Sequence, residues 1–167
     1  VRLYLNDGES QATAEVPVDP RGGIALQPGG LVVYDNARGA KGKIQFVSDE
    51  IGDEFTLDGS QRVINEIQFE YFAALNPFES TQKGVLRFYA NNGPAVADGG
   101  AKKPGDLLFE SDAFSLRAGY NMVTVSDLRV RVPEDVTSVT WAVEFTGVTN
   151  IGKVGLLQHD EPAKGAS

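Results

Sequence analysis

The sequence predicts an all-β protein, an antiparallel two-sheet β-sandwich with a jelly-roll-like arrangement of its strands. Apolar residues recur at every second position in many short runs, and no segment sustains the period of an amphipathic helix. The 19 glycines and 8 prolines interrupt these runs with frequent turns. The intervals between runs are too short to supply the crossover helices of a parallel sheet. A chain of 167 residues holds one ordinary core, so we expect a single domain over residues 1–167.

The expected strands follow one another between Asp-Gly, Asn-Gly, Pro-Gly and Gly-Gly pairs, which are typical turn sequences. In the first half of the chain these strands are 1–5, 13–18, 30–34, 44–48, 54–57 and 64–71. In the second half they are 85–90, 107–111, 122–126, 128–132, 141–146 and 153–158.

Two of these runs show the alternation of a half-buried strand most clearly. In 64–71, one face carries Ile67, Phe69 and Tyr71, whereas the other carries Glu66, Gln68 and Glu70. In 141–146, the residues predicted to face the core are Trp141, Val143 and Phe145. Because Trp141 shares its face with two apolar residues, we expect it in the core rather than in a sugar-binding surface.

The segment RFYANNGP, residues 87–94, predicts a strand that runs into a long polar loop over 91–105. Loops of this length often contact a partner, although a tolerated insertion is an open alternative. The predicted ligand-binding residues are those at the strand end and in the loop, with one further tyrosine in an expected turn: Arg87, Tyr89, Asn91, Asn92, Lys102, Lys103 and Tyr120.

The charge balance excludes several classes of partner. Lys and Arg total 15 against 23 Asp and Glu, a formal net charge of -8, which repels nucleic acid and anionic headgroups.

No apolar run approaches the ~20 residues of a membrane helix, so we expect no membrane insertion. The absence of cysteine excludes disulfides and thiolate chemistry.

The sequence carries no catalytic signature, and we expect no enzyme activity. The single histidine, His159, lies in a tail rich in Pro, Gly and Ala that is poorly suited to hold a catalytic base. Paired carboxylates remain as the one catalytic alternative, with Glu66, Glu70 and Glu144 as candidates. A row of outward glutamates is more typical of an exposed sheet face, where Arg87 would be their charge partner.

A structural calcium ion is the one cofactor that the sequence suggests. Acidic side chains gather in expected loops, and calcium requires only oxygen ligands with suitable geometry. The candidate ligands are Asp35, Asp53 and Glu54. Acidic turns that accept hydrogen bonds from backbone amides are the alternative interpretation.

The order of motifs over about half the chain resembles a group of exported bacterial β-sandwich domains found in proteins with a PEP-CTERM sorting tail. The resemblance rests on strand and turn motifs, which include Gly52-Asp53-Glu54-Phe55, Arg87-Phe88-Tyr89-Ala90-Asn91-Asn92-Gly93-Pro94, Pro104-Gly105-Asp106-Leu107 and Val139-Thr140-Trp141-Ala142-Val143. It implies an extracellular or cell-surface location and no catalytic residues.

The sequence therefore predicts a non-catalytic extracellular module that binds glycan or contributes to a surface matrix. Its expected partner is a polysaccharide or another envelope component. An alternative is a surface filament subunit, in which a segment such as Val1-Arg2-Leu3-Tyr4-Leu5 completes the sheet of another copy of the chain.

Overall fold

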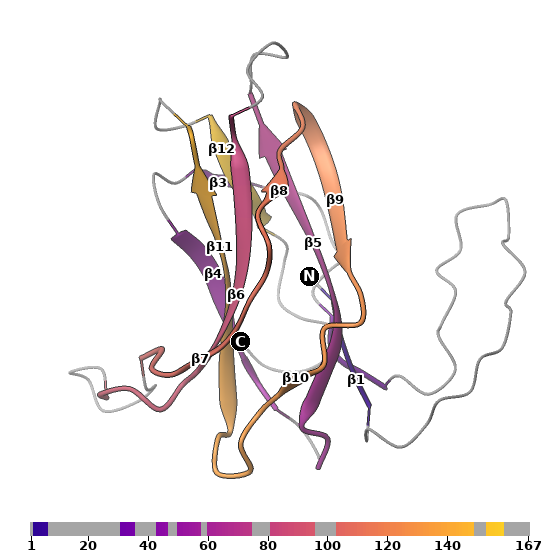
Figure 1. Cartoon of the computed structure of the whole chain (residues 1–167), viewed down its shortest axis with the longest axis vertical. Coiled ribbons are helices and arrows are strands. Elements are labelled where there is room, and N and C mark those ends of the chain that lie inside the picture. The colour runs from indigo at the N-terminus through magenta and orange to yellow at the C-terminus, as the bar shows by residue number, and fades with distance from the viewer. Residues whose placement is uncertain are drawn as a thin grey trace, which may run out of the picture.

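The computed structural model describes residues 2–6, 31–35, 43–46, 50–57, 60–74, 81–95, 103–148 and 153–158. These residues form two antiparallel β-sheets and no helix (Figure 1), which confirms the predicted all-β sandwich. In the part of the chain that the structure describes, no helix is long and apolar enough to span a membrane.

The first sheet contains seven strands. They are β1 (Arg2–Asn6), β2 (Leu31–Asp35), β3 (Lys43–Phe46), β5 (Val63–Ala73), β9 (Gly119–Val125), β10 (Val130–Arg131) and β12 (Val154–Gln158). The second sheet contains β4 (Glu50–Thr56), β6 (Lys83–Ala90), β7 (Leu107–Glu110), β8 (Phe114–Ser115) and β11 (Ser138–Thr146). Its order is β4-β11-β6-β7, with β8 also paired to β6.

Strand β5 is the centre of the first sheet, because it pairs with four other strands. Strand β1 pairs with residues 63–68 of β5, and β12 pairs with residues 71–73. Strand β10 pairs with residues 63–64, and β9 pairs with residues 67–73. A residue of a strand pairs with one neighbour on each edge, so β1 and β12 share one edge and β9 and β10 share the other. Both edges of β5 are therefore occupied.

The core lies between the sheets and is rich in aromatic side chains. The five predicted core residues are all buried, which confirms that prediction: Ile67, Phe69, Trp141, Val143 and Phe145. The rings of Phe69 and Trp141, one from each sheet, lie 5.5 Å apart. The indole nitrogen of Trp141 is buried with no hydrogen-bond partner among the described residues.

Several strand boundaries differ from the sequence predictions. Strand β4 begins at Glu50 rather than 54, because Glu50, Ile51 and Gly52 pair with β11 despite the weak strand propensity of Glu and Gly. The expected strand 128–132 is reduced to β10, because Asp127 and Arg129 adopt left-handed φ values of 57° and 53°. Strand β8 was not expected, and the expected strand 13–18 lies outside the described residues.

The predicted loop over 91–105 is partly a continuation of the β6–β7 hairpin. The Gly105 amide donates to the Ala90 carbonyl at 2.8 Å, and the Gly93 amide donates to the Lys103 carbonyl at 3.1 Å. The Lys103 amide donates in turn to the Pro94 carbonyl at 3.1 Å. Strand β6 ends at Ala90, as predicted, but backbone groups that follow it still find partners across the hairpin.

Replacement of Trp141 tests the packing of this core. Trp141→Ala should lower the free energy of unfolding by about 3–5 kcal/mol, because it removes a large buried ring. Trp141→Phe should cost clearly less, because it keeps an aromatic ring and removes the unpaired indole N–H. Chemical denaturation measures both, and equal losses for the two variants would contradict this account of the core.

Candidate functional site

Three aromatic side chains form a row across the outer face of the first sheet. Phe46 of β3 is in register with Gly155 of β12, Gly155 with Phe72 of β5, and Phe72 with Tyr120 of β9. This line of register thus crosses four adjacent strands, with an aromatic residue on three of them and Gly155 on the fourth. We call Phe46, Phe72 and Tyr120 the aromatic row.

The rings of the aromatic row touch one another and remain accessible. The centroids of Phe46 and Phe72 lie 6.5 Å apart at an interplanar angle of 80°, and those of Phe72 and Tyr120 lie 4.8 Å apart at 52°. Tyr120 is 68% exposed and Phe46 41% exposed, while Met122, two residues beyond Tyr120 in β9, is 65% exposed. The result is an exposed apolar patch, a feature that often marks a ligand-binding surface.

Gly155 lets the aromatic row form. A Cβ atom added at this position would collide with the backbone oxygen of Gln45 in β3. Any larger residue would therefore push β3 away from β12, and Phe46 would move with it. The missing side chain also leaves the space over β12 open to the edge-to-face contact between Phe46 and Phe72.

The outer face beside the aromatic row is polar and acidic. By alternation along β5, Glu70, Gln68 and Glu66 lie on the same face as Phe72. The Glu66 carboxylate accepts hydrogen bonds from the side-chain amide of Gln68 at 3.1 Å and from the Ser126 hydroxyl at 2.9 Å. This face combines an apolar strip with carboxylate and amide groups, a combination that suits a hydroxylated ligand.

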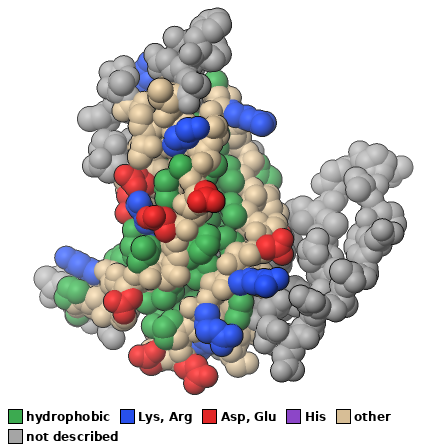
Figure 2. All heavy atoms as spheres, in the orientation of Figure 1, with side chains coloured by type: hydrophobic (Ala, Val, Ile, Leu, Met, Phe, Trp, Pro, Cys, Tyr) green, Lys and Arg blue, Asp and Glu red, His purple; other side chains and the backbone are tan. Residues whose placement is uncertain are grey.

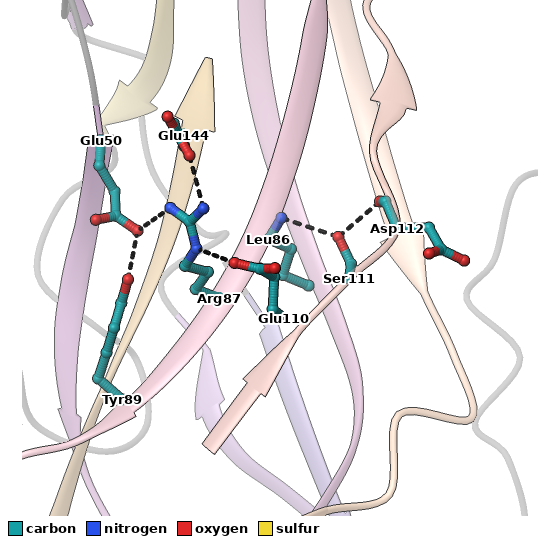
Figure 3. Close-up of polar contacts among 8 residues, drawn as sticks. All are labelled: Glu50, Leu86, Arg87, Tyr89, Glu110, Ser111, Asp112 and Glu144. Atoms are coloured by element: carbon teal, nitrogen blue, oxygen red, sulfur yellow. Dashed lines mark hydrogen bonds and ion pairs between the residues drawn. The ribbon is translucent and has the colours of Figure 1, made fainter. Parts of the chain in front are cut away.

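The predicted binding residue Arg87 lies in an ion-pair cluster on the outer face of the second sheet (Figure 3). Its guanidinium contacts Glu110 at 2.7 Å, Glu144 at 2.7 Å and Glu50 at 3.2 Å, so that β7, β11 and β4 each supply one carboxylate. The hydrogen bond to Glu110, followed by those to Glu144 and Glu50, raises the pKa of Arg87 above its ordinary value, although desolvation opposes the shift. Arg87 therefore stays charged and occupied.

The three carboxylates explain why the cluster requires an arginine. Glu144 and Glu50 stand directly opposite each other in the β11–β4 pair, and like charges at such positions are destabilising. The planar guanidinium donates in several directions and can bond all three groups at once. Three carboxylates against one guanidinium still leave the cluster with a net charge of two negative units.

Tyr89 is engaged with the same cluster. Its hydroxyl donates to Glu50 at 3.0 Å. Burial, and then the hydrogen bond and charge of Glu50, raise the pKa of the Tyr89 phenol. The hydroxyl that would donate to a sugar is thus already bonded within the protein.

The predicted pairing of Arg87 with outward glutamates is confirmed for Glu144 and wrong for Glu66 and Glu70. Glu144 belongs to the second sheet, next to the strand that carries Arg87. Glu66 and Glu70 belong to β5 in the first sheet and point away from the core on the opposite side of the sandwich. Alternation within one strand identifies its outer residues but not the sheet to which they belong.

The predicted binding residues of the hairpin stabilise its base. Asn91 is buried, accepts from the Thr140 hydroxyl at 2.8 Å and donates to the Ser138 hydroxyl at 3.1 Å. Asn92 donates to the Asp106 carboxylate at 2.8 Å and accepts from the Asp106 amide at 3.0 Å. Both amides therefore have structural partners.

The two predicted lysines of the hairpin differ in what the structure describes. Lys103 is exposed in the second arm of the hairpin. Lys102 lies outside the described residues.

The predicted calcium ligands do not come together in the described residues. Asp53 and Glu54 are consecutive in β4 and so point to opposite faces, and the Asp53 carboxylate accepts the Glu54 amide at 2.9 Å. Asp35 belongs to β2 in the other sheet. Among the residues described, no group of three or more His, Cys, Asp or Glu is arranged to hold a metal. Calcium binding stays a prediction.

Of the predicted ligand-binding residues, only Tyr120 belongs to the aromatic row. Its exposure agrees with the prediction, but it lies in strand β9 rather than in a turn. Phe72 was missed, although extending the alternation of Glu66, Gln68 and Glu70 by one step would place it on the outer face. Phe46 has no such signal, because only the pairing of β3 with β12 brings it to Phe72.

Comparison of the chain with protein-family models, curated proteins and solved structures returned no match.

Removal of Arg87 tests the ion-pair cluster. Arg87→Gln should lower the free energy of unfolding by about 1–2 kcal/mol near pH 7, because three partly exposed ion pairs are lost and their carboxylates then repel. Chemical denaturation near pH 7 measures the effect.

Arg131→Gln is the matched control for this experiment, because it makes the same charge change at an exposed position in β10. An equal loss for Arg131→Gln would show that the cluster does not stabilise the sandwich.

Proposed function

We propose that the protein is a non-catalytic, exported glycan-binding module and that the aromatic row is its binding surface. The observation that carries the proposal is the exposure of Tyr120 and Phe46 beside Phe72, in register across four strands. An unpaired apolar patch of this kind is costly to leave in water, which favours a ligand that covers it.

The geometry of the row supports an extended sugar chain as the ligand. Four adjacent strands span about 14 Å at the usual spacing of ~4.8 Å between strands. The apolar C–H face of a pyranose ring can pack on an aromatic ring, while its hydroxyl groups reach neighbouring polar groups such as the Glu70 carboxylate. A row of this length favours an oligosaccharide over a single sugar.

The tilt of the rings and the charge of the face restrict the class of glycan that fits this surface. The rings meet at 80° and 52° and therefore share no common plane, so a single soluble chain fits them better than a flat crystalline surface. Glu66 and Glu70 lie on the same face in a chain of net charge -8, which disfavours acidic glycans. We propose a neutral, soluble polysaccharide.

The order of strands supports the jelly-roll interpretation and, by analogy, carbohydrate binding. One sheet has the strand order β3-β12-β5-β9 and the other has the order β4-β11-β6-β7. The chain passes repeatedly between the two sheets. Jelly-roll folds occur in lectin domains, although a fold alone does not determine a function. The resemblance to exported bacterial domains supports the proposed extracellular location.

Strand exchange through residues 1–5 has less support. In the structure β1 pairs with β5 and β2 of its own chain. A filament built by donation of this strand would require β1 to leave β5, which would expose the edge of the central strand.

Replacement of Tyr120 tests the proposed surface. Tyr120→Ala should weaken binding to a neutral soluble polysaccharide by about 5- to 30-fold, the equivalent of about 1–2 kcal/mol for a lost aromatic contact. It should leave the free energy of unfolding within about 0.5 kcal/mol, because the side chain is largely exposed. A glycan array identifies the ligand, and calorimetry measures its affinity.

Tyr89→Ala is the matched control, because it removes a tyrosine from the outer face of the second sheet. Lys103→Gln tests the hairpin in the same way. Binding that survives Tyr120→Ala but is lost in either of these variants would move the site to the second sheet or the hairpin. Repetition with EDTA tests the predicted calcium ion.

A further inference from the structure

Strand β9 is an edge strand that lacks the usual protection against pairing. It bonds to β5 on one side, and no strand among the described residues pairs with its other side. Its sequence, Gly-Tyr-Asn-Met-Val-Thr-Val, contains no charged residue and no proline. Edge strands normally carry such residues, because exposed backbone groups otherwise recruit another strand.

Four longer edge strands of the described sheets carry the charges that β9 lacks. Strands β2, β3, β4 and β7 each contain at least one charged residue: Asp35, Lys43, Glu50, Asp53, Glu54 and Glu110. The uncharged sequence of β9 therefore contrasts with edges of the same molecule, in a chain of which 23% is charged.

An open apolar groove lies beside β9. It has a volume of about 520 Å³ and is bordered by β9 on one side and by the β7–β8 segment on the other, with Phe109, Phe114, Val123 and Val125 among its lining residues. All four are only partly buried against the core. Figure 2 shows hydrophobic side chains in a central band on this face of the molecule.

The groove has the shape and charge to receive the inward side chains of one more strand beside β9. Successive side chains of a strand alternate between faces, so a strand added to β9 would direct half of its side chains over the groove. Glu110, Asp112 and Asp127 also line the groove. These carboxylates disfavour acidic segments, whereas β9 itself is uncharged and carries Val123 and Val125 on its inward face.

We propose that β9 pairs antiparallel with β9 of a second copy of the chain and forms a closed dimer. A two-fold axis perpendicular to the sheet brings the same strand from each copy together, so the two β9 edges satisfy each other and no β9 edge remains for further growth. The valines of each β9 then cover part of the groove of the other copy. The first sheets of the two copies become one continuous sheet.

The dimer places two aromatic rows on one face, because this symmetry keeps the outer faces of both sheets on the same side. Tyr120 of β9 lies close to the seam in each copy. If the aromatic row binds glycan, as proposed above, the dimer binds a long chain at two places and gains avidity. The dimer itself does not depend on that function.

Analytical ultracentrifugation over a range of concentrations tests the dimer. The parent protein should sediment as a dimer that dissociates on dilution. Thr124→Lys should sediment as a monomer at concentrations at which the parent is dimeric, because it places a charge on the exposed face of β9 in each copy. Thr56→Lys, the same substitution at an exposed position of edge strand β4, should behave as the parent.

A parent protein that remains monomeric, a dimer that Thr124→Lys does not weaken, or assemblies that grow without limit would each overturn the proposal. Binding measurements separate the two proposals. Thr124→Lys should weaken binding to a long neutral polysaccharide on the order of 100-fold but leave binding to a short oligosaccharide of the same sugar unchanged. If Thr124→Lys abolishes the dimer but neither the parent nor the variant binds any glycan, the proposed function alone is overturned.

Discussion

The pairing of β5 on both edges is the constraint on which the rest of the structure depends. This eleven-residue strand bonds to β1, β9, β10 and β12, so its orientation fixes the position of most of the first sheet. Its inward face supplies Phe69, which packs on Trp141 of the second sheet. Its outward face supplies Phe72, the middle member of the aromatic row. The core and the candidate site are therefore held by the same backbone, and the site rests on a rigid element.

The outer faces of the two sheets differ in whether their side chains find partners within the protein. On the second sheet, Arg87 bonds the carboxylates of three neighbouring strands and Tyr89 bonds one of them, so the polar groups are satisfied within the protein. On the first sheet, Tyr120 and Phe46 leave apolar surface exposed. Exposure of this apolar surface to water is unfavourable, and a bound partner would remove it from water. This difference is why we place the binding surface on the first sheet.

Alternation predicted the fold and the core because it is a local property of each strand. It identified the inward residues of β5 and β11, including Trp141, without knowledge of their partners. It did not predict which strands become neighbours, since pairing depends on contacts between segments far apart in the sequence. The aromatic row depends on such contacts, because Phe46 and Phe72 meet only across β12 at Gly155.

The same limit explains which strand boundaries and hairpin contacts the sequence did not predict. The Asn-Asn-Gly-Pro turn sequence correctly predicted the end of β6 at Ala90, but not the hydrogen bonds that tie Asn91 to β11 and Asn92 to Asp106. Left-handed backbone at Asp127 and Arg129 shortened β10, although Leu128 to Val132 reads as a strand. Tertiary hydrogen bonds and single backbone conformations decided these boundaries.

The most direct test of the central claim, that the aromatic row binds glycan, is mapping of backbone amide chemical shifts by NMR. The protein would be titrated with soluble neutral oligosaccharides of glucose, mannose and galactose in separate experiments. Our account predicts that shifts for the binding sugar concentrate around Phe46, Phe72, Tyr120 and Gly155. Shifts that concentrate instead around Arg87 and Tyr89, or around Lys103, with the aromatic row unchanged, would contradict it.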